Sequence, residues 1–510
     1  MMDKVMQRTV LPSTVAAGEI MFKIQHLVNQ LNASGIRYCH WKSNLSLAES
    51  LSGSSDIDLL VHRNDATQFR GVLSHLGFQP ATPMDGESFP SVEHYYALDE
   101  ANGALAHVHA YYRVITGESL AKNYHFPIED LILQNTRREG SVPVPAKSVE
   151  LIVFTLRIML KHTSLMELFL MYRYWDTVRE EIHWLMEGAS QEKTIEYVSN
   201  WLPSIDTALF ATCIAAIQQP APLMHRIALA RRLRSQIRTY ARHSALYAWL
   251  VTVQRFAIMS SRRLTRTRKG MLLHSGGAVI AFVGPEATGK STLLGETKRW
   301  LGEHFAVEQV HAGKPKPTLL SFIPNRLVPT LRLLLPKYRS SHIEALHDHQ
   351  DGQQKAQSGF PLVFAIRAVL LAYDRRALLI HAHASAANGA IILCDRYPSM
   401  TRGAPDGPQL FHLLDEMDKN PLRRWLASTE QRLYQQIPTP DLVISLTVPV
   451  EVAVQRNKAR GKTEPEDYLR RRHALASHFD YGKAYVVSVS TDQPLGKTVL
   501  DIKRAIWNTL

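Results

Sequence analysis

Gly284, Gly289, Lys290 and Ser291 form the motif G-x-x-x-x-G-K-S over residues 284–291, and this spacing can hold a nucleoside triphosphate. The two glycines let the loop wind so that its N–H groups point inward at phosphate oxygens. Lys290 adds a mobile cation for the β- and γ-phosphates, and the Ser291 hydroxyl can ligate Mg²⁺. We therefore expect the chain to bind a nucleoside triphosphate, with ATP as the expected nucleotide, together with Mg²⁺.

The segments on both sides of this motif have the patterns needed to position it. Residues 278–283 are an apolar run typical of a buried strand, and a helical pattern follows Lys290. A helix that begins near Ser291 places the positive end of its dipole on the same anion. A chance glycine turn is the alternative, and the flanking strand and helix disfavour it. The predicted nucleotide-binding residues are Gly284, Glu286, Thr288, Gly289, Lys290, Ser291 and Thr292.

A second polar group follows the predicted strand 390–394. Asp395 would lie at the carboxyl end of this strand, where it can reach the Mg²⁺ shell or the attacking group. The neighbouring Arg396 is suited to binding an acceptor phosphate bidentately, although a strand-end salt bridge is the alternative. A later strand, 441–449, leads to a helix with Arg456 and Arg460, whose charges could close over the phosphates.

Strands and helices alternate from Gly276 to the end, which predicts an α/β fold with a parallel sheet covered on both faces. The strand–GPEATGKST segment, Asp374-Arg375, the strand–Asp395-Arg396-Tyr397 segment and residues 440–462 together resemble thymidylate kinase, in that family's order. The resemblance implies a P-loop kinase of the nucleoside monophosphate kinase type, with ATP and Mg²⁺ as cofactors. It implies the following roles: catalysis by Lys290, Asp395, Arg396, Arg456 and Arg460 (the last two in a lid), acceptor binding by Arg375, Arg396 and Tyr397, and Mg²⁺ binding by Ser291 and Asp395.

The chain departs from that family at two places. Glu286 stands where the family's P-loop usually has an aspartate, and the acceptor loop reads H-A-G-K-P-K-P-T at residues 311–318. An insert follows at residues 319–345, where apolar residues and arginines suggest an interface with the helical middle of the chain or with a membrane surface. The expected acceptor is therefore a phosphorylated or hydroxylated molecule other than thymidylate. A role in bacterial surface-polysaccharide metabolism is suggested by association only.

Two aspartates in the first third of the chain could hold a metal ion. In the strand-like segment 53–61, alternation puts Asp56 and Asp58 on the same face. Such close carboxylates repel each other and are best tolerated with a divalent cation between them, although capping a loop without a metal is the alternative. The strand–helix–G-S…D-x-D arrangement resembles the nucleotidyltransferase superfamily with the DNA polymerase β-like fold, which implies Mg²⁺ at Asp56 and Asp58. The family's third carboxylate is absent from strand 106–112, where His107 and His109 stand.

Helical spacing of apolar residues predicts a helical middle from about residue 148 to 257. Residues 142–145, V-P-V-P, are predicted to be a linker before it. Two basic clusters follow, and their helical spacing places four arginines of the first cluster on one face. These clusters are either solvated helix faces or a surface for an anionic membrane or nucleic acid. The clusters are Arg231, Arg232, Arg234, Arg238 and Arg242, and then Arg262, Arg263, Arg266, Arg268 and Lys269.

The composition fits a multidomain protein in a reducing compartment. The chain has 510 residues, a net charge of +13 and three cysteines that form no metal or disulfide pattern. Its start lacks the apolar core of a secretory signal, and no run is long enough to span a bilayer. We expect domains at 1–145 (nucleotidyltransferase-like), 146–272 (helical) and 273–510 (kinase-like), and a cytoplasmic location with peripheral contact at the inner face of the membrane. A homodimer is also compatible. The functions weighed are phosphoryl transfer, nucleotidyl transfer through Asp56 and Asp58, and an ATP-switched binding protein.

Overall fold

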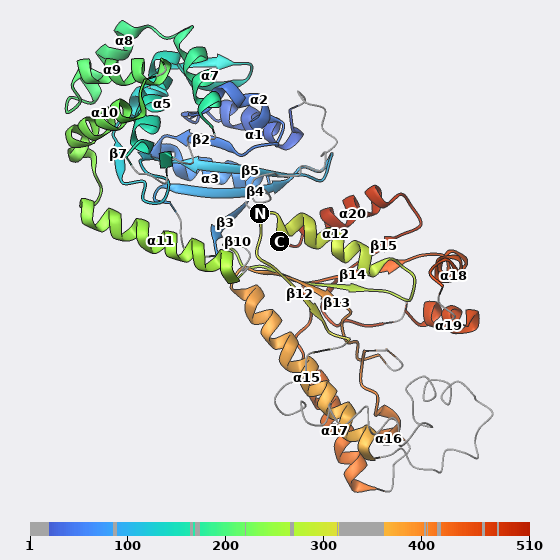
Figure 1. Cartoon of the computed structure of the whole chain (residues 1–510). Coiled ribbons are helices and arrows are strands. Elements are labelled where there is room, and N and C mark those ends of the chain that lie inside the picture. Colours follow the sequence, from blue (N-terminus) through green and yellow to red (C-terminus); the bar gives the residue numbers. More distant parts are fainter. Residues whose placement is uncertain are drawn as a thin grey trace. The chain divides into compact units, whose positions relative to one another are not determined.

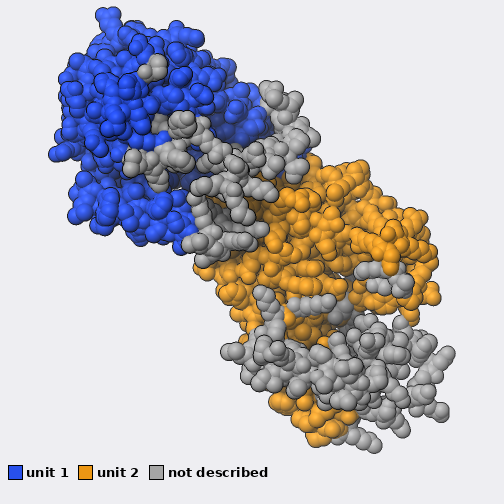
Figure 2. All heavy atoms as spheres, in the orientation of Figure 1, with its two compact units in different colours: residues 1–269 blue, residues 270–510 orange. Residues whose placement is uncertain are grey.

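The computed structural model divides the chain into two compact units, residues 1–269 and 270–510 (Figures 1 and 2). The first unit contains the predicted domain 1–145 and residues 146–269 of the predicted domain 146–272, whose last three residues belong to the second unit. The structure describes residues 20–84, 89–163, 167–168, 174–219, 221–265, 270–313, 315, 362–401, 404, 406–415, 420–461, 465–476 and 479–510. The insert 319–345 and the side chains of the second basic cluster lie outside the described residues.

A mixed sheet forms the centre of the first unit. Its strands are β1 (Tyr38–His40), β2 (Ile57–Val61), β5 (Leu105–Tyr111), β4 (Val92–Leu98) and β3 (Gln79–Pro83), in that spatial order. Strands β2 and β5 run parallel, and the other neighbouring pairs run antiparallel. This parallel pairing places Asp58 of β2, and Asp56 just before it, next to the histidines of β5.

Alternation along these strands divides the sheet into an apolar face and a polar face. Ile57, Leu59 and Val61 point into a core that they share with α1 (Phe22–Ala33) and α3 (Ala66–His75). Because successive side chains alternate, Asp58 and the histidines of β5 lie on the opposite face. The prediction that the two aspartates share one face is confirmed, because both contact histidines of β5.

Helices pack beside the polar face of this sheet. Helix α5 (Lys147–Lys161) is buried on nearly every side, as expected for a central helix, and its core includes Trp41, Leu60 and Tyr111. The prediction of a helical middle is confirmed over the described residues. The surrounding helices are α7 (Trp175–Met186), α8 (Gln191–Trp201), α9 (Thr207–Gln218), α10 (Leu223–Gln236) and α11 (Ala245–Thr265), and the smaller elements of the unit are α2 (Leu47–Leu51), β6 (Val114–Thr116), β7 (Tyr124–Phe126), α4 (Glu129–Gln134) and β8 (Thr136–Glu139).

Two predictions for this unit are wrong. Residues Val142–Pro145 form a buried strand, β9, rather than a linker, because Val142 and Val144 join the core of α1 and α3. The arginines of the first basic cluster do not follow one helix face, because α10 ends at Gln236, before Arg238. Arg234 instead donates to Glu118 and to the Tyr124 hydroxyl, both at 3.0 Å.

The second unit contains a fully parallel sheet, as predicted. Its spatial order is β12 (Val307–His311), β13 (Ile391–Asp395), β11 (Val279–Val283), β14 (Leu442–Thr447) and β15 (Tyr485–Ser490). The chain order reverses on the two sides of β11, so the carboxyl end of β11 is a topological switch point. In open parallel sheets such a point is where ligands bind.

Helices cover both faces of this second sheet (Figure 1). Helix α15 (Leu362–Ala387) packs Leu379, Ala382 and Ala386 against alternate residues of β11 and β13. Helices α12 (Lys290–Gly302) and α20 (Leu495–Trp507) contact each other and the strands on the other side. The remaining elements are β10 (Met271–Leu273), α16 (Phe411–Asp415), α17 (Pro421–Gln435), α18 (Val450–Ala459) and α19 (Glu466–Ala476). Among the described helices of the chain, none has an apolar stretch that would let it cross a bilayer.

Candidate active site

The glycine-rich loop lies between β11 and α12, as the sequence predicts. Gly284 has a φ of 143°, and a Cβ there would lie 2.6 Å from the Leu446 carbonyl oxygen, so only glycine fits. Gly289 precedes α12 with a φ of 85°, and Ala287 is held at 63° in the same left-handed region. Non-glycine residues in this region are strained and cluster at ligand sites. The loop therefore has the left-handed backbone positions that occur where a glycine-rich turn leads into a helix at an anion site.

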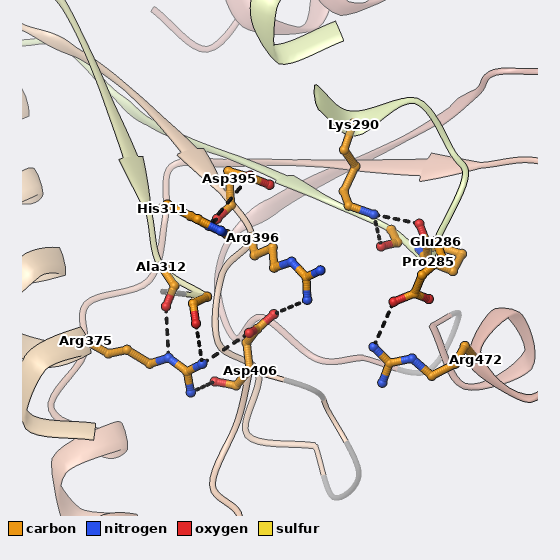
Figure 3. Close-up of polar contacts among 12 residues, drawn as sticks. Pro285, Glu286, Lys290, His311, Ala312, Arg375, Asp395, Arg396, Asp406 and Arg472 are labelled. Atoms are coloured by element: carbon orange, nitrogen blue, oxygen red, sulfur yellow. Dashed lines mark hydrogen bonds and ion pairs between the residues drawn. The ribbon is translucent and has the colours of Figure 1, made fainter. Parts of the chain in front are cut away.

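The Lys290 ammonium group binds the loop itself in this structure (Figure 3). Its Nζ atom donates to the carbonyl oxygens of Gly284 at 2.7 Å and Pro285 at 2.6 Å. Burial lowers the pKa of Lys290 to about 8, against the opposing effect of the Glu286 carboxylate. The predicted ligand Thr288 is fully buried and donates to Pro285, which makes it a support of the loop. Ser291 and Thr292 are exposed at the first turn of α12.

Helix α19 contacts the loop at Glu286. Arg472 donates to Glu286 Oε1 at 3.3 Å, and His473 Nε2 lies 3.1 Å from the Glu286 carbonyl oxygen, to which it can donate. Burial on its own would raise the pKa of Glu286, but the Arg472 guanidinium outweighs it and the pKa is lowered. The other carboxylate oxygen, Oε2, is buried and has no hydrogen-bond partner among the described residues.

Asp395 and Arg396 leave the sheet beside this loop. Strand β13 pairs in parallel with β11, and Asp395 is in register with Phe282, two residues before Gly284. The Asp395 carboxylate lies 3.6 Å from His311 Nδ1 and stays partly exposed. Arg396 has a φ of 70°, and this strained backbone turns its side chain out of the strand direction. Its side chain is 37% exposed, and its guanidinium lies 3.5 Å from Asp406 Oδ2.

Arg375 is buried beneath this pair and binds protein groups (Figure 3). Its guanidinium donates to the carbonyl oxygens of Ala312, Gly313 and Asp406, to the Asp406 carboxylate and to the Tyr434 hydroxyl. These five contacts match the five N–H groups of a guanidinium. Arg375 therefore fixes the loop after β12 and the Asp406 segment, and its predicted contact with the acceptor stays a prediction.

Four of the predicted residues of the second unit line one hollow, namely Gly284, Glu286, Arg396 and Tyr397, while Lys290 and Asp395 stand close by (Figure 3). Tyr397 is buried, and its hydroxyl donates to the Pro438 carbonyl oxygen at 2.6 Å. Burial raises the pKa of that hydroxyl.

Two predicted lid residues lie elsewhere in the contact network. The Arg456 guanidinium donates to the Thr491 hydroxyl oxygen at 3.1 Å and to the Thr491 carbonyl oxygen at 2.8 Å. Arg460 is exposed at the end of α18. Their lid role stays a prediction. Sequence reasoning missed Arg472 and Asp406, which line the same hollow as Glu286 and Arg396. The run of three arginines at 470–472 was the available signal for the first, and nothing local distinguishes Asp406.

The aspartates of the first unit are bound by neighbouring side chains. His107 Nδ1 lies 2.8 Å from Asp56 Oδ1, and His109 Nδ1 lies 3.2 Å from Asp58 Oδ1. Burial acts to raise the pKa of Asp56, but the hydrogen bond from His107 and the charges of His107 and His109 together outweigh it and lower that pKa to about 2. Lys42 forms an ion pair with Asp58 at 3.1 Å and donates to the Tyr111 hydroxyl at 2.8 Å, so it is a member of the site.

Comparisons with known proteins find relatives for about 45% of the chain. It is 24% identical over 232 residues to an uncharacterized ATP-binding protein, YghR, of Escherichia coli K12, covering 45% of the chain and 86% of that relative. It is 26% identical over 248 residues to a thymidylate kinase of Pseudomonas fluorescens, covering 46% and 97%. Two solved thymidylate kinases match with little sequence identity. That of Ehrlichia chaffeensis has a TM-score of 0.23 and 15% identity, and the match covers 45% of this chain and 97% of that one. That of Candida albicans has a TM-score of 0.28 and 17% identity, and the match covers 46% of this chain and 94% of that one.

No family model matches the chain. The sequence relatives, the parallel sheet and the loop at 284–291 agree with one another on the kind of domain present. Together they support a kinase-like, nucleotide-binding P-loop domain in the chain.

Proposed function

We propose that the second unit transfers a phosphoryl group from ATP to a phosphorylated or hydroxylated acceptor. The parallel pairing of β11 and β13 supports this most directly, because the P-loop and the Asp395–Arg396 pair leave the same edge of the sheet. The names of the sequence relatives, an ATP-binding protein and a thymidylate kinase, agree with it. The wider setting proposed from the sequence, bacterial surface-polysaccharide metabolism, still rests on association alone.

The loop has the features that a triphosphate requires. Gly284 leaves no room for a side chain, and the first turn of α12 offers N–H groups and the positive end of a dipole. Ser291 and Asp395 have the hard oxygen ligands that suit Mg²⁺ and would hold it. When bound, Mg²⁺ would neutralise negative charge on the phosphoryl oxygens.

Each cation of the hollow has a distinct part in this proposal. Lys290 would exchange its two carbonyl partners for phosphate oxygens, which are stronger acceptors because they are charged. Arg396 would bind the acceptor phosphate with its partly exposed side chain, in place of the Asp406 carboxylate that it contacts in this structure. Arg472 offsets the charge of Glu286, which would otherwise repel a polyphosphate.

Mass spectrometry of a host-cell extract, incubated with the full chain, ATP and Mg²⁺, tests this function. We expect a small molecule to gain one phosphoryl group. Lys290→Ala should lower that turnover by roughly 100-fold or more, because positioning and charge carry this chemistry. Lys298→Ala is the matched control, since Lys298 lies on the same helix and binds Gln309. Full activity of Lys290→Ala would show that the kinase proposal is wrong.

A second candidate is nucleotidyl transfer by the first unit. The observation in its favour is that Asp56 and Asp58 share a polar face with lowered pKa values, so both are ionised, and ionised carboxylates are ligands that Mg²⁺ prefers. Asp58→Asn should then abolish a nucleotidylated product in the same extract and leave phosphoryl transfer intact.

If ATP binds and no molecule is modified, the chain is better described as an ATP-switched binding protein. Retention on anionic liposomes or nucleic acid, with and without ATP, would then test the basic residues of the first unit.

A further inference from the structure

Three histidines converge on the polar face of the first sheet. His94 lies on β4, and His107 and His109 lie on β5, with His94 in register with His109. Each ring offers one nitrogen, and these three atoms all lie within 4.8 Å of one another. Metal–nitrogen bonds are about 2.0–2.1 Å long, so nitrogens around one tetrahedral ion lie roughly 3.4 Å apart, and small ring rotations would bring the three atoms to that spacing.

The strand alternation fixes this convergence. Ala106, Val108 and Ala110 point into the core shared with α1 and α3, which forces His107 and His109 to the other face. The side chains of His107 and His109 are only 11% and 17% exposed. The His107 ring also stacks on Tyr96, with centroids 4.1 Å apart. The rings therefore hold their positions through packing.

Carboxylates orient two of these rings from behind. Asp56 accepts a hydrogen bond at His107 Nδ1, so His107 Nε2 is the nitrogen that faces His94 Nδ1, 3.2 Å away. Asp58 is placed in the same way behind His109 Nδ1. Histidines that bind metals commonly donate their second ring N–H to a carboxylate, which fixes the tautomer and leaves the other nitrogen free to coordinate.

An imidazole nitrogen coordinates a metal ion through the lone pair of the neutral ring. Neutral imidazoles suit Zn²⁺ and similar transition metals, whereas Mg²⁺ prefers oxygen ligands.

We propose that His94, His107 and His109 together bind one divalent transition-metal ion of the imidazole-preferring class, with Zn²⁺ as the reference ion. Asp56 and Asp58 act as hydrogen-bond acceptors that orient the rings. Three protein ligands leave a fourth position for water or for Asp56, whose Oδ2 lies 3.8 Å from His109 Nε2. The Mg²⁺ site expected at the two aspartates is the competing account.

Metal titration of the full chain separates the two accounts. After treatment with a chelator, the protein is titrated with Zn²⁺ against a chromophoric competitor, and with Co²⁺ while its visible spectrum is recorded. We expect one tight equivalent of Zn²⁺ and the absorption of four-coordinate Co²⁺ with nitrogen ligands. Both should disappear in His94→Gln and His107→Ala. His125→Ala is the matched control, because His125 is in the same unit and contacts Glu129.

Asp56→Asn keeps all three imidazoles and weakens only the orienting contact. It should lower Zn²⁺ affinity by about 10–100-fold while keeping the form of the Co²⁺ spectrum. This variant also decides the matter if His107→Ala fails to fold, which far-ultraviolet circular dichroism would reveal. Absence of tight Zn²⁺ binding by the natural chain would overturn the proposal. So would Zn²⁺ binding that survives His94→Gln, or that Mg²⁺ displaces and Asp58→Asn abolishes.

Discussion

At the scale of the residue, the fold lowers the pKa of Lys290. Burial holds its pKa at about 8, whereas a phosphate partner would stabilise the charged form and raise that pKa. We therefore expect ATP to bind the form in which Lys290 is protonated. Above pH 8, binding should be accompanied by the uptake of one proton.

The affinity for ATP should fall as the pH rises through about 8, by about tenfold per pH unit until the pKa of the complex is reached. Titration calorimetry in two buffers of different ionisation enthalpy would measure both the affinity and the proton uptake. Lys290→Arg is the control, because arginine stays charged and should flatten the profile. Equal affinity from pH 7 to 10 in the natural chain would contradict this assignment.

The fold raises the pKa of Glu150, which lies on α5. It accepts from the Asn44 backbone at 3.2 Å and from the Asn44 side chain at 2.8 Å, and burial raises its pKa to about 7. The folded state therefore holds a proton that the unfolded chain releases near pH 4.5. Stability of the first unit should fall as the pH rises from about 4.5 to 7, because ionisation favours the unfolded chain in that window.

Urea unfolding at pH 5 and pH 8 measures this loss, which should be about 3 kcal/mol at most. Glu150→Gln removes the titrating group and should remove most of the difference between the two pH values. An unchanged difference in the variant would assign the pH dependence to other groups.

At the scale of elements, helix α19 sets the charge of the P-loop. Arg472 pairs with Glu286, so Arg472→Ala would leave a buried carboxylate next to the triphosphate. We expect ATP affinity to fall by about tenfold, which corresponds to about 1.4 kcal/mol. Adding Glu286→Gln to that variant should restore most of the affinity, and a double-mutant cycle would give the coupling. Arg471→Ala is the matched control, since Arg471 is the preceding residue on α19 and contacts Asp467. Additive effects of the two substitutions would show that the pair is not coupled.

The elements also show what the sequence could and could not predict. The P-loop, β13 and Asp395 follow from patterns within a few residues of one another, so local reasoning finds them. Arg472 and Glu286 are 186 residues apart, and only the folded sheet reveals that they meet. The two prolines of β9 suggest a break and so predict a linker, whereas the burial of Val142 and Val144 makes this segment a strand. The sequence shows His107 and His109 as an H-x-H pair on one strand. That His94 lies next to them follows only from the pairing of β4 with β5.

At the scale of the molecule, two compact units with separate cores should unfold as two events. Differential scanning calorimetry of the full chain should resolve two transitions. ATP at a hundred times its dissociation constant should stabilise only one of them, by about 2.7 kcal/mol. Lys290→Ala should lose this shift while keeping both transitions. A shift of both transitions in the natural chain would mean that the units unfold together.

The carboxylate of Asp406 is shared by Arg375 and Arg396, at 3.2 and 3.5 Å. In the resting protein it serves as a built-in substitute for the anion that Arg396 is proposed to receive. An arriving acceptor phosphate would displace Asp406 from Arg396 and leave it with Arg375, so every charge in the hollow keeps a counter-charge throughout. Acceptor binding would then be an exchange of one anion for another on Arg396. Molecules that bind Arg396 more weakly than the Asp406 carboxylate does would not be accepted as substrates.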